Sequence, residues 1–168
     1  MPSDYIKKDQ LVILRDTRET IKRFSSPYWT KHFKVEDVTL TRGDYSFKYK
    51  GIDYRSIFVI EYKRVCELLG NIGSDDRDEF KKKITTCAQG TDFYRLVVEG
   101  SLAQFLDPLF CKSNMDRFLA FTTIFKWQVE NRNLKFEFIP DNNIGSTQLL
   151  AEMVIYEFIE GFIKYSVR

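Results

Sequence analysis

The chain has 168 residues, 43% of them hydrophobic and 15% aromatic, which is ample for the core of one folded domain. Its 26 Lys and Arg residues nearly balance its 24 Asp and Glu residues, so the net charge of +2 excludes a strong overall attraction to nucleic acid, and any basic surface must be local. The sequence has no signal peptide and no apolar run near the ~20 residues of a membrane span, which predicts an intracellular protein.

The first predicted strand is the apolar run at 11–14, which leads into the charged sequence Arg-Asp-Thr-Arg-Glu. Acids directly after a buried strand can face a cleft. Alternatively, Asp16 or Thr17 caps a helix over 20–24, and Glu19 favours the N-terminal end of its dipole. Both interpretations stay open.

The remaining chain alternates between strand and helix patterns. Strands are expected over 35–40, 44–50, 54–63, 93–99 and 134–139, with a turn at Gly51, and helices over 64–69, 76–89, 115–130 and 147–164. A short helical turn is expected over 28–33, and a polar loop over 70–75. This alternation predicts an α/β fold with a central mixed sheet, in which parallel pairs lie beside an antiparallel hairpin meander. No linker divides the chain, so we expect one domain with its core at about 11–164.

The cysteines and the histidine exclude several kinds of site. Cys66, Cys87 and Cys111 are an odd number without the spacing of metal ligands, and we expect buried thiols in a reducing compartment. His32 is the single histidine, so two-histidine metal motifs are excluded and a Ser-His-Asp triad would depend on this residue alone. Because His32 stands among aromatic residues, we expect it to pack or to lie at the surface. Metal chemistry with oxygen ligands remains.

One segment in the middle of the chain carries charged residues in a chemically suggestive order. The apolar run 57–60 suits a strand covered on both faces, and period 2 then places Glu61 and Lys63 on one face, ~6.6 Å apart. Gly43 permits a tight turn that would bring Asp44 alongside. Two carboxylates and a backbone carbonyl are a sufficient protein share of the roughly six oxygen ligands of Mg²⁺. The pattern predicts a metal site that cuts phosphodiesters.

The same residues have a structural interpretation. Gly-Asp is a common turn pair, and Glu-x-Lys at a strand end is often a solvated ion pair. Because the Gly-Asp pair and the Glu-x-Lys sequence occur together, with an apolar strand before Glu-x-Lys, the metal site is favoured. The run Lys81-Lys82-Lys83 is either a solvated helix face or a phosphate-contact surface, and both interpretations stay open.

Four motifs follow one another along the chain. They read Asp16-Thr17-Arg18-Glu19, Gly43-Asp44-Tyr45, Ile60-Glu61-Tyr62-Lys63 and Leu96-Val97-Val98-Glu99-Gly100. In this order they resemble the nuclease domain of the XPF/Hef family of structure-specific DNA endonucleases, which belongs to the PD-(D/E)xK superfamily. The resemblance covers nearly the whole chain and implies a restriction-endonuclease-like fold, with helices flanking the central mixed sheet.

The resemblance also implies roles for individual residues. The catalytic candidates are Asp44, Glu61, Lys63, Asp16 and Glu19. Asp44, Glu61 and the backbone carbonyl of Tyr62 would hold Mg²⁺, with Mn²⁺ as a substitute. The expected DNA contacts are Arg18, Arg77, Lys81, Lys82 and Lys83. Tyr62 departs from the family pattern, which usually has arginine there, and Lys81 stands where a glutamine is common.

The implied function is metal-dependent hydrolysis of DNA, with a preference for branched, flapped or forked DNA in repair, recombination or replication. Two alternatives stay open: a catalytically silent DNA-binding or dimerisation subunit, and a restriction-type nuclease that reads a fixed sequence. The chain carries neither the helix-hairpin-helix domain nor the helicase domain of many family members. A separate helicase or DNA-targeting partner is therefore expected. The protein itself is expected in the cytoplasm, the nucleoid or the nucleus.

The closing helix predicts a homodimer, as the family resemblance also implies. Its polar residues Glu152, Glu157, Glu160 and Lys164 occupy an arc of about 140°, which leaves an apolar face wider than the ~100° stripe needed for packing on one sheet. The candidates for a second contact surface are Leu150, Val154, Ile155, Phe158, Ile159 and Phe162. The alternative is a helix buried deep in its own domain.

Overall fold

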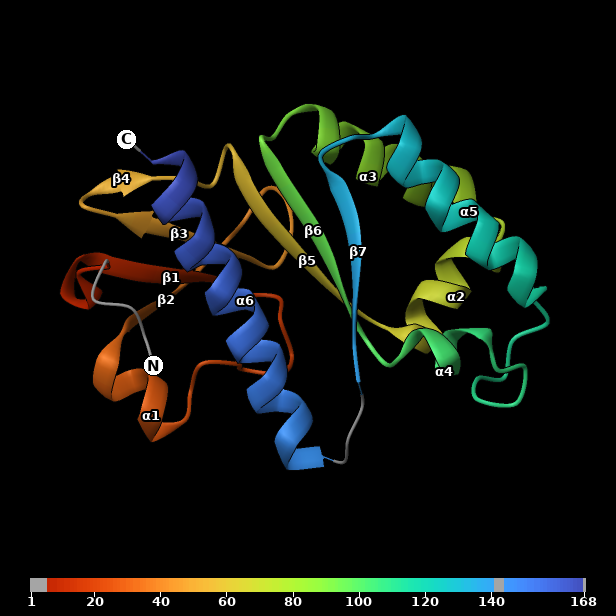
Figure 1. The fold of residues 1–168 in the computed structure, drawn as a ribbon, viewed down its shortest axis with the longest axis horizontal. Helices are drawn as coiled ribbons and strands as arrows, with labels where there is room; N and C mark the ends of the chain where they lie inside the picture. Colours follow the sequence, from red (N-terminus) through yellow and green to blue (C-terminus); the bar gives the residue numbers. More distant parts are fainter. Residues whose placement is uncertain (1–5, 141–143, 168) are drawn as a thin grey trace.

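The computed structural model describes residues 6–140 and 144–167, and a twisted sheet lies at its centre (Figure 1). The strands are β1 (Leu11–Asp16), β2 (Lys34–Val38), β3 (Tyr45–Tyr49), β4 (Ile52–Asp53), β5 (Phe58–Arg64), β6 (Phe93–Glu99) and β7 (Leu134–Ile139). The helices are η1 (Lys8–Gln10), α1 (Pro27–His32), α2 (Val65–Gly73), α3 (Arg77–Gln89), α4 (Leu102–Leu106), α5 (Arg117–Glu130) and α6 (Ile144–Ser166). The predicted α/β class with a mixed sheet is confirmed.

The strand order is β2-β1-β3-β5-β6-β7, with the short β4 paired to β3. Strands β5, β6 and β7 are parallel neighbours, whereas β3 is antiparallel to both β1 and β5. The predicted hairpin meander is wrong at β2, which lies parallel to β1 rather than beside β3. Helix α1 forms the crossover that a parallel connection between β1 and β2 requires.

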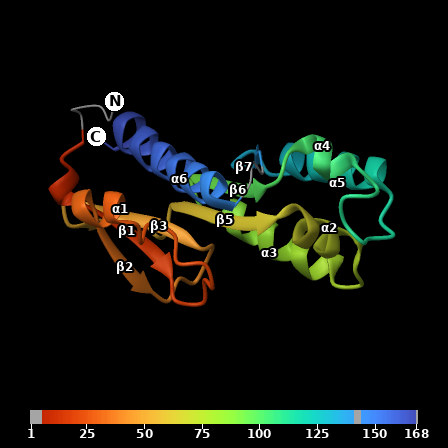
Figure 2. The same cartoon turned by 90° about the horizontal axis from the view of Figure 1, so that it is seen from below.

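Helices cover the two faces of the sheet in different ways. Helix α6 lies on one face, and α2, α3, α4 and α5 gather on the other (Figures 1 and 2). Strand β5 is buried on both sides, as its apolar run predicts: Phe58 and Ile60 pack in the core under α6, and Val59 packs under α2 and α3. In the described part of the chain, no helix is both long and apolar enough to cross a membrane.

Several element boundaries differ from the prediction. Helix α2 continues to Gly73, so most of the loop expected over 70–75 is helical. The predicted helix over 20–24 is absent: this segment forms turns, and Phe24 adopts a left-handed φ of 62°. The ring of Phe24 packs against Trp29 and Tyr45, so tertiary packing overrides the local helical pattern. Helix α4 was not predicted, since a five-residue helix leaves too short a pattern.

The cysteine prediction is wrong for two of the three residues. Cys66 and Cys111 form a disulfide that joins the start of α2 to the segment between α4 and α5. Only Cys87 is a free, buried thiol. The paired cysteines are 45 residues apart, and they meet because α2 packs against α4 and α5, which their spacing does not reveal.

Helix α6 uses its wide apolar face inside its own domain. Ile155, Ile159 and Phe162 are buried in the core, so these three cannot form the predicted second contact surface. Glu152 and Glu160 were expected on the polar arc but are only 2% and 8% exposed. The face is wide because α6 is covered twice, by the sheet and by α1, whose aromatic residues pack on Tyr156.

Glu152 connects α6 to α1. Its carboxylate accepts hydrogen bonds from the backbone N–H of Phe24 at 2.5 Å and from the indole N–H of Trp29 at 2.6 Å. Both donors are buried, so loss of the acceptor would leave them without a hydrogen-bond partner, because water cannot reach them.

We therefore expect Glu152→Ala to lower the free energy of unfolding by about 3 kcal/mol, because two buried donors lose a charged acceptor. Glu152→Gln keeps one carbonyl oxygen and should lose about half as much. Urea unfolding followed by circular dichroism measures both. The control is Glu157→Ala on the exposed side of α6, expected to change stability by less than about 0.5 kcal/mol. Equal losses at Glu152 and Glu157 would contradict the anchoring role.

Candidate active site

The predicted residues Asp44, Glu61 and Lys63 meet at the C-terminal end of β5. The backbone N–H of Asp44 donates to the carbonyl of Ile60 at 2.8 Å, and its Oδ2 accepts from the N–H of Tyr62 at 2.7 Å. These two bonds fix the Asp44 carboxylate against the strand that carries Glu61. Lys63 lies on the same face as Glu61, as period 2 predicts, with its Nζ 3.2 Å from Glu61 Oε1.

Gly43 allows this approach. Its φ is +66°, and a Cβ at this position would lie 2.7 Å from the carbonyl oxygen of Ile60 and closer still to the side chain of Val59. No other residue type fits the turn without moving it away from β5. The turn predicted at Gly43 therefore lies directly against β5 and holds Asp44 beside this strand.

Burial and mutual repulsion shape the electrostatics of the carboxylate pair. Glu61 is 2% exposed. Burial, and then the negative charge of Glu61, raise the pKa of Asp44 to about 7. Burial disfavours the charged form of Lys63, but the carboxylates of Glu61 and Asp44 outweigh it and raise the pKa of the ammonium. Asp44 is thus the acid of this pair whose charged form is disfavoured.

This donor set fits a hard divalent cation. The N–H of Tyr62 points toward Asp44, and in a strand the carbonyl of a residue points to the same side as its N–H, so the Tyr62 carbonyl also lies on that side. Two carboxylates and one carbonyl supply oxygen ligands only, the chemistry that Mg²⁺ prefers. Residues 6–140 and 144–167 contain no cluster of three or more His, Cys, Asp or Glu side chains suited to a metal. The site proposed here uses two carboxylates and one backbone carbonyl, so it does not depend on such a cluster.

Asp16, predicted as an outer acid, is occupied by hydrogen bonds. Its carboxylate accepts from the backbone N–H and the guanidinium of Arg18 and from the backbone N–H of Leu40, at distances of 2.7–2.9 Å. The bond from the Arg18 side chain is the main cause that lowers the pKa of Asp16 to about 2. Asp16 is therefore neither a helix cap nor a free acid: it anchors the loop after β1 to the end of β2.

Glu19 and Arg18 lie closer to the carboxylate pair. Glu19 accepts a hydrogen bond from the hydroxyl of Tyr45 at 3.3 Å, and its charge contributes to the raised pKa of Asp44. The exposed Arg18 guanidinium feels the charges of Asp44 and Glu61, which help to raise its pKa, although its bond to Asp16 is the larger cause. Both residues line a hollow of about 750 Å³ that Lys63 also borders.

Tyr62 points to the opposite face of β5 and belongs to a second network. Its hydroxyl donates to Glu99 at 2.5 Å, and the guanidinium of Arg23 lies 3.6 Å from the centre of its ring. Arg23 also lies 3.5 Å from the carboxylates of Glu19 and Glu99. A guanidinium is therefore present beside the position where the family pattern has arginine, but it comes from the loop after β1. No pattern in the sequence indicated this role of Arg23.

The predicted basic residues of α3 divide into two groups. Arg77 donates to Thr123 at 3.2 Å, and Lys81 pairs with Glu130 at 2.9 Å, so both are tied to α5. Lys83, in contrast, reaches Glu61.

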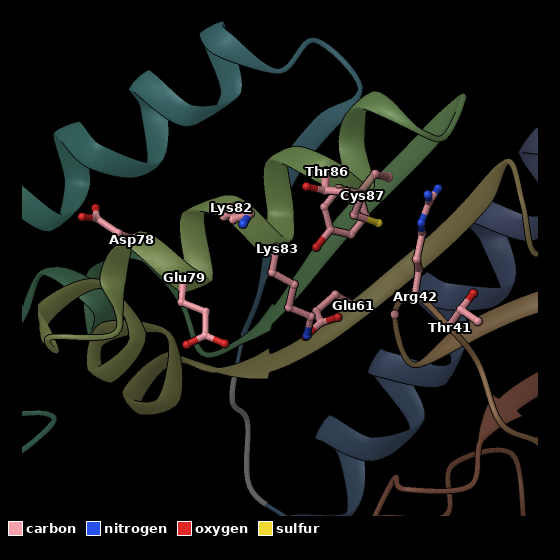
Figure 3. A pocket seen from close by; sticks show the side chains of 11 residues that line it. Thr41, Arg42, Glu61, Asp78, Glu79, Lys82, Lys83, Thr86 and Cys87 are labelled. Carbon is pink, nitrogen blue, oxygen red and sulfur yellow. The ribbon is translucent and has the colours of Figure 1, made fainter.

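Lys82 and Lys83 line a hollow of about 690 Å³ beside Glu61 (Figure 3). Arg42, which the sequence analysis did not identify, stands on the opposite side, where its guanidinium donates to the carbonyl of Gly90 at 2.9 Å. Burial raises the pKa of the Cys87 thiol in this hollow to about 12, so it is not a thiolate nucleophile at neutral pH.

No protein-family model and no curated protein matches the sequence. Solved structures do match. XPF from Aeropyrum pernix superposes with a TM-score of 0.66 and 14% identity, over 94% of this chain and 62% of that chain. The same protein in complex with DNA gives a TM-score of 0.66 and 13% identity, over 94% and 67%. The chain has the XPF-type fold that its four motifs predicted, and it spans about two thirds of those chains.

The raised pKa of Asp44 predicts a pH-dependent cost to stability. An unfolded aspartate ionises near 3.8, whereas folded Asp44 ionises near 7, so the folded state holds the extra proton between these values and stability falls as pH rises. Below pH 3.8 both states are protonated and the cost vanishes. Linkage sets an upper limit of about 4 kcal/mol above pH 7, which solvent screening reduces.

Asp44→Asn removes the charge and keeps an oxygen for the Tyr62 N–H. In EDTA we therefore expect it to be more stable than wild type at pH 8 by about 1–2 kcal/mol, with the difference closing toward pH 4. Urea unfolding at both pH values measures the gap. A gap that does not widen with pH would show that Asp44 is not ionising against Glu61.

Proposed function

We propose that this chain is a DNA nuclease that hydrolyses phosphodiester bonds with Mg²⁺, or with Mn²⁺ in its place. The observation that carries the proposal is the placement of Asp44 beside Glu61 by two hydrogen bonds to the backbone of β5, with Lys63 on the same face. The XPF-type fold supports it, because the motif resemblance and the structural similarity agree.

Asp44, Glu61 and the Tyr62 carbonyl are the proposed metal ligands. When bound there, the ion would polarise a phosphoryl oxygen and lower the pKa of a bound water. Lys63 stays charged at neutral pH, so its ammonium can donate to a phosphate oxygen and orient the attacking water. Attack by this water would form the new P–O bond and break the P–O bond to the leaving oxygen; the water would release its proton to solvent, and the departing alkoxide would take one from solvent. Asp44 must give up its proton to bind the ion, which links metal binding to pH.

DNA is the proposed partner. One structural neighbour was solved in complex with DNA. In this chain, Arg18 borders the carboxylate pair on one side, and Lys82 and Lys83 border it on the other. Nothing in these side chains predicts base reading, so we propose recognition of DNA structure, with branched, flapped or forked DNA preferred. A silent subunit would have no need of the paired Asp44 and Glu61, which favours an active enzyme.

The purified chain should cut end-labelled flapped or forked DNA with Mg²⁺ or Mn²⁺, faster than it cuts linear duplex or single strands. With Ca²⁺ it should bind DNA without cutting, because the longer 2.3–2.6 Å bonds and looser geometry of Ca²⁺ do not align the water. Asp44→Asn and Lys63→Ala should both stay folded, with Asp44→Asn melting no lower than wild type, and should lose activity by about 100-fold or more.

The control for these variants is Lys31→Ala, because Lys31 is an exposed lysine of α1 that lines neither hollow beside the carboxylate pair. Full cleavage by the folded Asp44→Asn variant would refute the metal site. Discrete fragments from a linear plasmid would instead indicate the restriction-type alternative.

We also propose a homodimer, but through a different surface from the one predicted on α6. Helices α4 and α5 and the segment between them expose the apolar residues Leu102, Leu106, Leu109, Phe110, Phe118, Leu119, Phe125 and Val129. Phe118, Phe125 and Val129 follow helical spacing along one side of α5, and Phe118 is 74% exposed. Monomers rarely expose so many apolar side chains together.

Phe118→Glu combined with Phe125→Glu should convert the dimer to a monomer, because two charges would be buried at its centre. Light scattering at micromolar concentration gives the mass. The matched control is Met153→Glu on the exposed side of α6, where Met153 is 48% exposed. Loss of the dimer in the Met153 variant alone would return the interface to α6, and a monomeric wild type would remove the proposal.

A further inference from the structure

Two ammonium groups converge on one oxygen of the proposed metal site. Lys63 Nζ lies 3.2 Å from Glu61 Oε1, and Lys83 Nζ lies 2.8 Å from the same atom. Glu61 is 2% exposed, and a buried carboxylate needs compensating charge. The two lysines thus supply beside Glu61 the positive charge that a metal ion bound to Glu61 would otherwise supply.

The two lysines differ in their freedom to leave. Lys63 is on the same strand as Glu61, two residues away, and its side chain is 25% exposed. Lys83 comes from α3, and its side chain is 56% exposed. A dication held by two carboxylates neutralises them fully, so two nearby ammonium groups would then be in excess and would repel it. The more exposed lysine is the one that can move away from the ion.

The hollow beside Glu61 offers Lys83 another partner. Figure 3 shows Lys83 pointing to Glu61, with Arg42 across the hollow, and with Asp78 and Glu79 toward its other end. A DNA phosphate between Lys83 and Arg42 would have a cation on either side. Lys83 could exchange the Glu61 carboxylate for this phosphate without crossing the hollow.

We propose that Lys83 couples metal binding to DNA binding: it pairs with Glu61 and competes with the metal when DNA is absent, and it pairs with a phosphate when DNA is bound. This inference rests on the proposed nuclease function. Coupling is reciprocal, so DNA would raise metal affinity and the metal would raise DNA affinity by the same factor. The arrangement would keep the metal site weak until a substrate is present.

The test measures Mn²⁺ affinity directly, from the loss of the free-ion signal in electron paramagnetic resonance, with protein alone and with flapped DNA. In the metal titration without DNA, Lys83→Met should bind Mn²⁺ roughly tenfold more tightly than wild type, the factor expected for losing a charge-assisted competitor. With DNA the two proteins should bind Mn²⁺ similarly, so the gain in affinity on adding DNA should be about tenfold smaller in the variant.

Two variants separate this contact from general effects of charge and folding. Lys82→Met removes the same charge from the same hollow, but no ion pair of Lys82 is found among the described residues, and it should shift Mn²⁺ affinity by about twofold at most. Lys83→Arg keeps the competing cation and should behave like wild type. Lys83→Gln, which removes the charge but keeps a polar end, should match Lys83→Met if the latter melts early.

The outcomes distinguish the inference from the function on which it rests. Wild type that neither binds Mn²⁺ nor cuts DNA would remove the nuclease proposal. Wild type that binds and cuts, beside a Lys83→Met variant with unchanged Mn²⁺ affinity, would overturn the coupling alone. Equal gains from Lys82→Met and Lys83→Met would show a general charge effect and would also overturn it.

Discussion

The contact between the Gly43–Asp44 turn and the backbone of β5 is the constraint on which the site depends. Strands β3 and β5 pair at a single register, Tyr45 with Ile60, so the two hydrogen bonds of Asp44 take over where the ladder stops. This junction joins the half of the sheet built from β1, β2 and β3 to the parallel half built from β5, β6 and β7. The carboxylate pair lies where the two halves diverge.

Buried charge explains the residues gathered around this junction. Glu61 is compensated by Lys63 and Lys83, whereas Asp44 keeps a raised pKa because its hydrogen bond to a neutral amide does not offset burial and the charge of Glu61. Asp16 shows the opposite case: its hydrogen bond from Arg18 is the largest cause that lowers its pKa. Two acids that follow similar sequence patterns thus have pKa values shifted in opposite directions by the groups that surround them.

A second network of polar contacts lies on the opposite face of β5. Tyr62, Arg23 and Glu99 join the middle of the sheet to the loop after β1, and Glu19 extends this network toward Asp44. Because Tyr62 also supplies the N–H that holds Asp44, the two faces of the strand are mechanically connected. The departure of Tyr62 from the family pattern therefore changes the network behind the site, while the carboxylate pair keeps its backbone support.

Local patterns in the sequence determined the strands β1, β5, β6 and β7, the mixed sheet, the Gly43 turn and the shared face of Glu61 and Lys63. These features follow from the spacing of apolar residues along the chain and from the conformational freedom of glycine, both of which depend only on residues close together in the sequence. The tertiary structure decided which lysine of α3 reaches Glu61, because this depends on the orientation of α3 about its own axis where it packs on the sheet and on α5.

Tertiary structure alone also decided the partners of Asp16, the place of Arg23, the disulfide of Cys66 and the burial of α6. Each of these depends on contacts between segments distant in sequence. Such contacts form only when two faces pack, and the composition of either segment does not specify which face it will meet.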